Sequence, residues 1–152
     1  MGKIISFSNQ KGGVGKTTTC VNMAAYLSRA GKKVLLIDLD PQGNATTGLG
    51  FSKGTLKKSV YNVVIEGEEV KDNILETELE GLYILPSNID LAGAEVDLVY
   101  KKNRDRVLKA ALEKAKGAFD YILIDCPPSL GLLTINALSA ADSAIIPIFL
   151  SS

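Results

Sequence analysis

The chain has 152 residues, of which 46% are hydrophobic and 6% aromatic, and this suffices for one domain with a real hydrophobic core. Seventeen basic residues balance seventeen acidic ones, so no overall field favours binding to nucleic acid or to an anionic membrane. The sequence holds no histidine, which excludes imidazole bases and histidine-ligated metals, and its two cysteines are too few for a disulfide scaffold.

The first third of the chain predicts two strands and a helix. Residues 3–8 form an apolar run that predicts a strand, and residues 16–30 have apolar residues at helical spacing, with Gly31 as the expected C-cap. Val34–Ile37 is a continuous apolar run, typical of a parallel strand that is buried on both faces. Residues 42–54 are rich in Gly, Asn and Thr and predict a loop.

The remainder alternates between helical and strand patterns. Residues 59–66 predict a short helix, 82–86 a strand, 88–99 and about 103–116 two helices, 121–125 a strand, 131–140 a helix and 144–148 a final strand. This alternation predicts an α/β fold with a mostly parallel, doubly wound sheet flanked by helices, in one domain over residues 1–152. We expect Cys20 and Cys126, on a helix and at a strand end, to be buried thiols.

A glycine-rich segment between the first strand and the first helix predicts a phosphate-binding loop. The segment runs Lys11-Gly12-Gly13-Val14-Gly15-Lys16-Thr17-Thr18. Glycines allow several backbone N–H groups to point at one anion, and the helix N-terminus adds partial positive charge. Lys16 is expected to bind the β- and γ-phosphates, and the Thr17 hydroxyl to bind Mg²⁺.

The loop departs from the common phosphate-loop pattern. Gln10 stands where that pattern has glycine, and a second lysine, Lys11, precedes two glycines. Because Lys16 already supplies a cation, we expect Lys11 to reach a nucleotide on another subunit, as an arginine finger does. The alternative is an ordinary surface lysine in a glycine turn.

Three aspartates follow the apolar strands. Asp125 ends the strand at 121–125 and is expected to hold Mg²⁺, since ligands of open α/β sheets bind past the carboxyl ends of the strands. Asp38 and Asp40 end the second strand, and we assign Asp38 to the metal shell and Asp40 to the attacking water. Loop capping is the alternative for these two, and a solvated aspartate that caps the next turn is the alternative for Asp125. The set supports Mg-ATP hydrolysis without a covalent intermediate.

Three segments of the chain resemble the ParA/Soj partitioning ATPases, within the MinD/ParA group of proteins with a deviant Walker A loop. They are Asn9–Thr18, Asp38–Thr46 and Ile124–Gly131, and Leu91-Ala92-Gly93-Ala94-Glu95 is similar as well. The resemblance implies that Lys11 contacts the partner subunit's nucleotide in an ATP-dependent homodimer. It also implies that Lys16 is the phosphate-binding lysine and that Thr17 is the magnesium ligand. By the same resemblance, Asp40 corresponds to the acid needed for hydrolysis and Asp125 to the second acidic motif.

The resemblance further implies an ATPase switch in chromosome or plasmid segregation. ATP and Mg²⁺ are its expected cofactors, and a ParB/Spo0J-like protein and non-specific DNA its expected partners. With no apolar span long enough for a membrane, we expect a cytoplasmic protein, and the resemblance implies that it associates with the nucleoid.

Members of that family continue beyond the point where this chain stops, and the resemblance fades after Pro147. We therefore expect a truncated chain that lacks much of the adenine pocket and the main DNA-binding surface. Two alternatives are a catalytically inactive phosphate-binding fragment and a MinD-like division-site ATPase. An iron-protein-like reductase would need a cysteine pair at a dimer interface, which Cys20 and Cys126 do not resemble.

Overall fold

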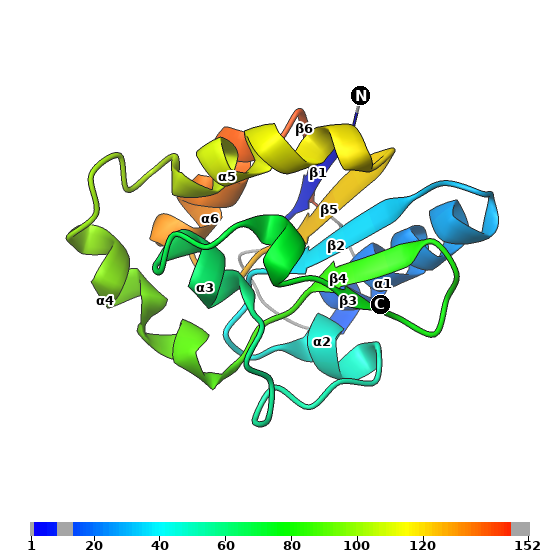
Figure 1. Cartoon of the computed structure of the whole chain (residues 1–152), viewed down its shortest axis with the longest axis horizontal. Coiled ribbons are helices and arrows are strands. Elements are labelled where there is room, and N and C mark those ends of the chain that lie inside the picture. Colours follow the sequence, from blue (N-terminus) through cyan, green and yellow to red (C-terminus); the bar gives the residue numbers. More distant parts are fainter. Residues whose placement is uncertain (1, 9–13, 147–152) are drawn as a thin grey trace, which may run out of the picture.

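A computed structural model describes residues 2–8 and 14–146 of the chain. Within them, six strands form one sheet in the order β3-β4-β2-β5-β1-β6, with helices on both faces (Figure 1). All neighbouring strands are parallel except β3 and β4, which are antiparallel. The predicted α/β fold with a mostly parallel sheet is confirmed.

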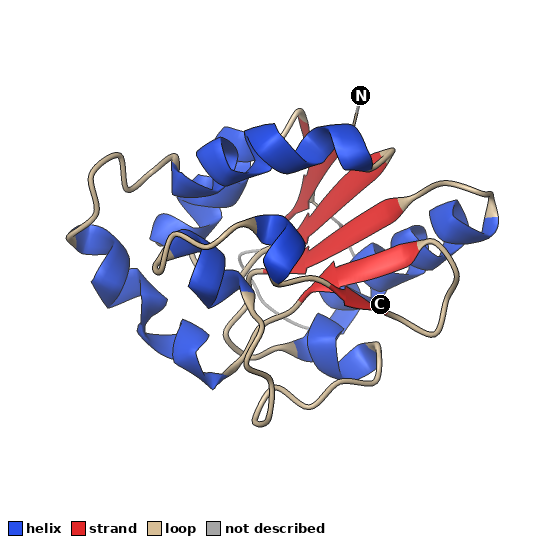
Figure 2. Ribbon diagram, in the orientation of Figure 1, coloured by secondary structure: helices blue, strands red, loops and turns tan. Residues whose placement is uncertain are grey.

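The strands of the sheet are short and carry the apolar runs of the sequence. Figure 2 shows them as the central layer between helices. Their bounds are β1 Lys3–Phe7, β2 Val34–Asp38, β3 Leu75–Glu76, β4 Leu82–Leu85, β5 Tyr121–Asp125 and β6 Ser143–Ile145.

The helices alternate with these strands. Their bounds are α1 Val14–Arg29, α2 Asn44–Gly48, α3 Val60–Val64, α4 Ala94–Val99, α5 Val107–Ala115 and α6 Leu132–Ala140, with short 3₁₀ turns η1 Val70–Asp72, η2 Ile89–Gly93 and η3 Lys116–Ala118. Gly31 follows α1 with φ of 87°, a left-handed conformation that glycine adopts without strain, as expected for its C-cap position.

Two hydrophobic cores lie on opposite faces of the sheet, because alternate strand residues point to opposite sides. Val34 and Leu36 belong to the core under α1, whereas Leu35 and Ile37 belong to the larger core under α3 to α6. Every residue of β2 is buried, as expected for a parallel strand covered by helices on both sides.

The structure differs from the sequence prediction in five details. The segment 42–54 contains the short helix α2, and the strand β3 and the turn η1 were not predicted. The segment 88–99 begins with the 3₁₀ turn η2 before α4. The helix expected from about residue 103 begins at Val107, because Asn103 is left-handed, with φ of 57°, and cannot continue an α-helix.

Candidate functional site

The first turn of α1 carries the predicted phosphate-binding residues. α1 begins at Val14, earlier than the sequence indicated, so Gly15, Lys16, Thr17 and Thr18 are all helical. This is the helix N-terminus that an anion favours. Lys11, Gly12 and Gly13 lie outside the described residues, as does the side chain of Val14, so their predicted roles stay predictions.

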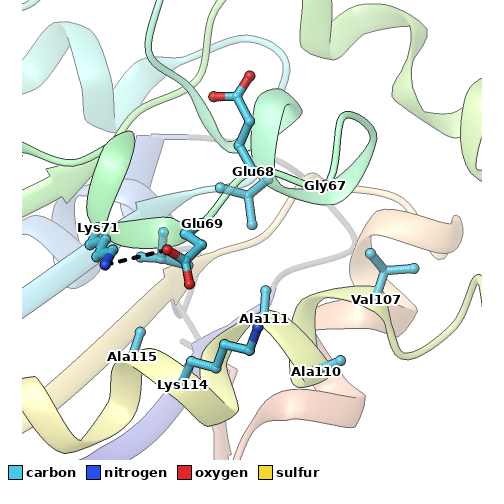
Figure 3. A pocket seen from close by; sticks show the side chains of 11 residues that line it. Gly67, Glu68, Glu69, Lys71, Val107, Ala110, Ala111, Lys114 and Ala115 are labelled. Carbon is cyan, nitrogen blue, oxygen red and sulfur yellow. Dashed lines mark ion pairs between the residues drawn. The ribbon is translucent and has the colours of Figure 1, made fainter.

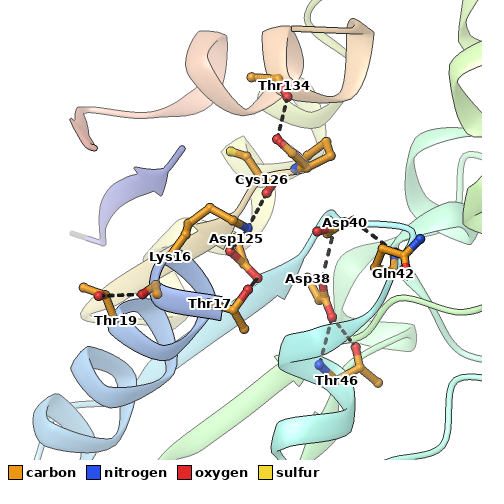
Figure 4. Close-up of polar contacts among 12 residues, drawn as sticks. Lys16, Thr17, Thr19, Asp38, Asp40, Gln42, Thr46, Asp125, Cys126 and Thr134 are labelled. Carbon is orange, nitrogen blue, oxygen red and sulfur yellow. Dashed lines mark hydrogen bonds and ion pairs between the residues drawn. The ribbon is translucent and has the colours of Figure 1, made fainter. Parts of the chain in front are cut away.

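Lys16 and Thr17 converge on Asp125 at the end of β5 (Figure 4). The Lys16 ammonium donates hydrogen bonds to the Asp125 carboxylate and to the carbonyl oxygen of Cys126. The Thr17 hydroxyl donates to the other carboxylate oxygen of Asp125 at 3.0 Å. Lys16 is only 2% exposed, so its charge is balanced inside the protein by an ion pair rather than by water.

The electrostatics of Asp125 reflect two opposing effects. Burial raises the pKa of this carboxyl above its ordinary value, while Lys16 and the Thr17 hydroxyl oppose the rise by stabilising the charged form. The negative charge of Asp40 raises the pKa of Asp125 further.

Asp38 lies beside Asp125, since these two residues pair in the register of β2 and β5. Asp38 lies two residues after Leu36, and Asp125 two residues after Leu123, and both leucines belong to the core under α1. Because alternate strand residues point to the same face, both carboxylates are directed toward the helix that carries Lys16. The sequence assigned both residues to magnesium, and the topology brings the two strand ends together.

Protein donors already occupy both oxygens of Asp38. One oxygen accepts from the backbone N–H of Thr46 at 2.8 Å and from its hydroxyl at 2.6 Å, and the other accepts from the backbone N–H of Asp40 at 3.2 Å. Burial raises the pKa of Asp38 to about 7, while the bonds from Thr46 oppose the rise. Asp38 thus organises the turn after β2, as the capping alternative expects, and its place in a metal shell stays a prediction.

Asp40 stands in the turn that follows β2. One of its oxygens accepts from the backbone N–H of Gln42 at 3.0 Å, and the residue is 5% exposed. The carbonyl oxygens of Pro41 and Gln42 accept hydrogen bonds from the Lys53 ammonium at 3.1 and 2.9 Å. The turn that presents Asp40 is therefore held from inside by Asp38 and from outside by Lys53.

Sequence reasoning missed Thr46 and Lys53. Thr46 is fully buried, and its hydroxyl also accepts from the backbone N–H of Ser87 at 3.0 Å. Thr46 follows glycine and asparagine, a composition that is typical of an ordinary loop. The position of Lys53 in the sequence does not indicate its two carbonyl partners. The available signal was Asp38 itself, because a buried carboxylate needs donors.

The site offers oxygen donors of the kind that Mg²⁺ prefers. The Thr17 hydroxyl and the Asp125 carboxylate are within hydrogen-bond distance of each other, so both can face one small cation. Across the described parts of the chain, no three or more Cys, Asp or Glu residues form a ready-made metal cluster. Magnesium also binds substrate phosphates and water, so two protein donors fit its usual mode of binding.

A separate cavity lies between the segment after α3 and helix α5 (Figure 3). Its volume is about 410 Å³, and both apolar and charged residues line it. It contains none of the predicted site residues. Its lining includes Val63, Glu68, Glu69, Val107, Ala111 and Lys114.

The structure also places the remaining features of the sequence. Cys20 and Cys126 are buried free thiols, as expected. The densest basic cluster of the sequence, Lys101, Lys102, Arg104 and Arg106, lies in turns and bends between α4 and α5. Within residues 2–8 and 14–146, no helix is long and apolar enough to cross a membrane.

The comparisons with known proteins agree with the motifs. A family model described as AAA domain, AAA_31, matches residues 2–152. The chain is similar to the sporulation initiation inhibitor protein Soj of Bacillus subtilis, at 57% identity over 97% of this chain and 58% of that protein. It is also similar to the chromosome partitioning protein ParA of Myxococcus xanthus, at 50% identity over 97% of this chain and 52% of that protein.

The solved structures give the same result. The cobyrinic acid a,c-diamide synthase from Mycobacterium smegmatis, with bound ATP analog and magnesium, aligns with a TM-score of 0.93 and 47% identity over 97% of this chain and 60% of that one. The chain thus spans little more than half of the length of these relatives. The family match over residues 2–152, together with the phosphate loop and acidic strand ends, shows that the chain belongs to the AAA_31 family and is a relative of the Soj and ParA proteins.

Proposed function

We propose that this chain is the Mg-ATP-binding part of a ParA/Soj-type ATPase, folded as a single domain over residues 1–152. The observation that carries the proposal is the convergence of Lys16 and Thr17, from a helix N-terminus, on Asp125 at the carboxyl end of a parallel strand. A relative of known structure binds an ATP analog and magnesium, which supports ATP and Mg²⁺ as the ligands here.

The proposed roles follow from these positions. Lys16 binds the β- and γ-phosphates, together with backbone N–H groups of the loop. The other residues of this loop are Lys11, Gly12, Gly13, Val14, Gly15, Thr17 and Thr18. Thr17 and Asp125 hold magnesium, with Asp38 in the metal shell or beside it. Asp40 orients the attacking water, since its carboxylate is held in the turn that directly follows Asp38 at the same edge of the sheet.

At the level of the whole protein, we propose an ATP-dependent dimer that acts in chromosome or plasmid segregation. The support is the similarity to a chromosome partitioning protein ParA. Lys11 would contact the nucleotide of the second subunit, and a ParB/Spo0J-like partner and DNA would bind the longer form of the protein. The relatives extend well beyond the residues present here, so these partners are proposed for the longer protein.

The test is nucleotide binding and hydrolysis by the purified chain, with Mg²⁺ and a fluorescent ATP analogue. Lys16→Ala should weaken binding by roughly 10- to 100-fold, as expected for loss of a charge-assisted contact. Lys109→Ala, which changes an exposed lysine on α5, is the matched control and should bind like the parent. Asp40→Ala should bind nucleotide but lose turnover, whereas the exposed Asp105→Ala should retain both.

The outcomes separate the alternatives. Binding and turnover that depend on Lys16 and Asp40 support the ATPase. Binding without turnover supports a catalytically inactive nucleotide-binding fragment. A folded chain that binds no nucleotide overturns the proposal for this chain.

A further inference from the structure

The segment after Asp125 is tied to helix α4 by one side chain. Glu95, on α4, accepts hydrogen bonds from the backbone N–H groups of Leu132 and Leu133 at 2.7 and 3.0 Å, one with each carboxylate oxygen. These N–H groups lie in the first turn of α6 and have no partner within the helix. The N-cap residue Gly131 has no side chain that could bind them, so Glu95 caps α6 from a distant part of the sequence.

The contact with Glu95 needs a glycine at position 131, although the backbone conformation of this residue does not. Its φ of −80° is one that any residue adopts. A Cβ atom at this position would lie 2.5 and 2.6 Å from the two carboxylate oxygens of Glu95, closer than real Cβ contacts occur. A side chain at residue 131 would therefore displace Glu95 from the helix terminus.

The segment that Glu95 fixes carries one of the two acceptors of Lys16. The carbonyl oxygen of Cys126 accepts from the Lys16 ammonium. The following residues, Pro127 and Pro128, have no backbone N–H and cannot anchor themselves through that group. The Thr134 hydroxyl of α6 donates to the carbonyl oxygen of Ser129 at 2.5 Å, so the segment is held from the α6 side. The start of α6 is in turn held by Glu95.

We infer that Glu95 is a positioning residue of the phosphate site. It acts through α6 and the segment 126–131 to hold the Cys126 carbonyl against Lys16, so that Lys16 is oriented before a nucleotide arrives. This inference rests on the proposed function for its consequence, but its structural part can be tested without nucleotide. It also gives a reason for the Leu91–Glu95 motif, which lies outside the phosphate loop and the acidic strand ends.

The structural test is a double-mutant cycle read by thiol labelling. Cys126 is the buried first residue of the segment, and Cys20, on α1, is buried in the core on the other face of the sheet, so alkylation followed by peptide mass analysis reports each separately. Glu95→Ala and Gly131→Ala should each speed labelling of Cys126 by roughly 3- to 30-fold, as expected for loss of one helix cap. In the double variant, Cys126 should label no faster than in Glu95→Ala, because the Cβ atom added at residue 131 no longer meets the Glu95 carboxylate.

Two comparisons distinguish positioning from general destabilisation. Glu95→Gln keeps one acceptor oxygen and should restore part of the protection of Cys126. Cys20 should label at the parent rate throughout, and Glu113→Ala, at an exposed glutamate on α5, should change neither thiol. Equal labelling of Cys126 in Glu95→Ala and Glu113→Ala, or additive effects in the double variant, would overturn the inference.

The nucleotide test uses the same variants with Mg²⁺ and the fluorescent ATP analogue. Glu95→Ala should weaken binding by about 3- to 10-fold because Lys16 must then be ordered on binding, and it should have no further effect in the Lys16→Ala background. Normal affinity in Glu95→Ala, with a parent chain that binds, would refute the positioning role and leave the proposed function intact. Absence of binding by the parent would instead refute the proposed function, while the labelling result still decides whether Glu95 fixes the segment.

Discussion

Thr46 offers the sharpest test of how the turn after β2 is held. Its hydroxyl donates to Asp38 at 2.6 Å and accepts from the backbone N–H of Ser87 at 3.0 Å, with all three residues buried. Thr46→Val keeps the shape of the side chain and removes only this hydroxyl. The backbone bond from residue 46 to Asp38 remains.

The magnitude follows from the two lost contacts. A hydrogen bond to a charged group contributes about 1.5–3 kcal/mol, and a buried N–H left without an acceptor costs about 1–3 kcal/mol. Allowing for partial relaxation, we expect the free energy of unfolding to fall by about 3 kcal/mol. For a domain of this size, that lowers the Tm by roughly 6–12 °C.

The effect should depend on pH with a defined sign. Burial raises the pKa of Asp38 to about 7, above its unfolded value, so its ionisation lowers the stability of the fold as pH rises from about 4 to 7. The Thr46 hydroxyl opposes that rise, since it stabilises the charged form. The loss of stability in Thr46→Val should therefore be larger at pH 8, where Asp38 is charged, than at pH 5.

Thermal and urea unfolding by circular dichroism measure this directly. Thr47→Val, one residue along and exposed, is the matched control and should change stability by less than about 0.5 kcal/mol. Thr46→Ser retains the hydroxyl and should restore most of the loss. If Thr46→Val and Thr47→Val unfold alike, or if the loss is greater at pH 5, the reasoning about the Asp38 network is refuted.

Two further predictions concern backbone conformation and thiol chemistry. Gly43 has φ of 69°, and a Cβ there would lie 2.9 Å from the Lys53 side chain, so Gly43→Ala should lower the free energy of unfolding by about 1–3 kcal/mol. Gly48→Ala, where nothing lies within 4 Å of the new Cβ, is the control, and urea unfolding of both decides the point. Burial raises the pKa of Cys126 to about 11, so its alkylation in the native chain should still accelerate with pH between 8 and 10. A rate that levels off by pH 9 would contradict that pKa.

The elements that the sequence predicted are those whose signals are local. The run Val34–Ile37 and the strand at 121–125 are too apolar for anything but a buried strand, and the structure places both at the centre of the sheet. The placement of Asp125 at the ligand edge of the sheet followed from the rule that ligands bind past strand ends, whereas its contact with Lys16 is seen only in the structure.

The missed elements depend on tertiary contacts. The helix α2 consists of Asn, Ala, Thr and Gly, which favour a helix only weakly, and the buried oxygen of Asp38 stabilises it by accepting from Thr46. The strand β3 is two residues long and pairs with β4 at the edge of the sheet, so it has no periodic signal of its own. The contact between Glu95 and the start of α6 spans 37 residues, and no local pattern indicates it.

The ion pair between Lys16 and Asp125 has a consequence for the order in which ligands bind. A buried lysine paired with a carboxylate presents a neutral dipole, so a free triphosphate meets little net attraction from this residue. A divalent cation at Thr17 and Asp125 would neutralise the carboxylate and leave the charge of Lys16 available to the phosphate. Under the proposed function, magnesium and nucleotide must then each raise the affinity of the other by the same factor. Titrations performed in either order should yield one and the same thermodynamic linkage between the two ligands.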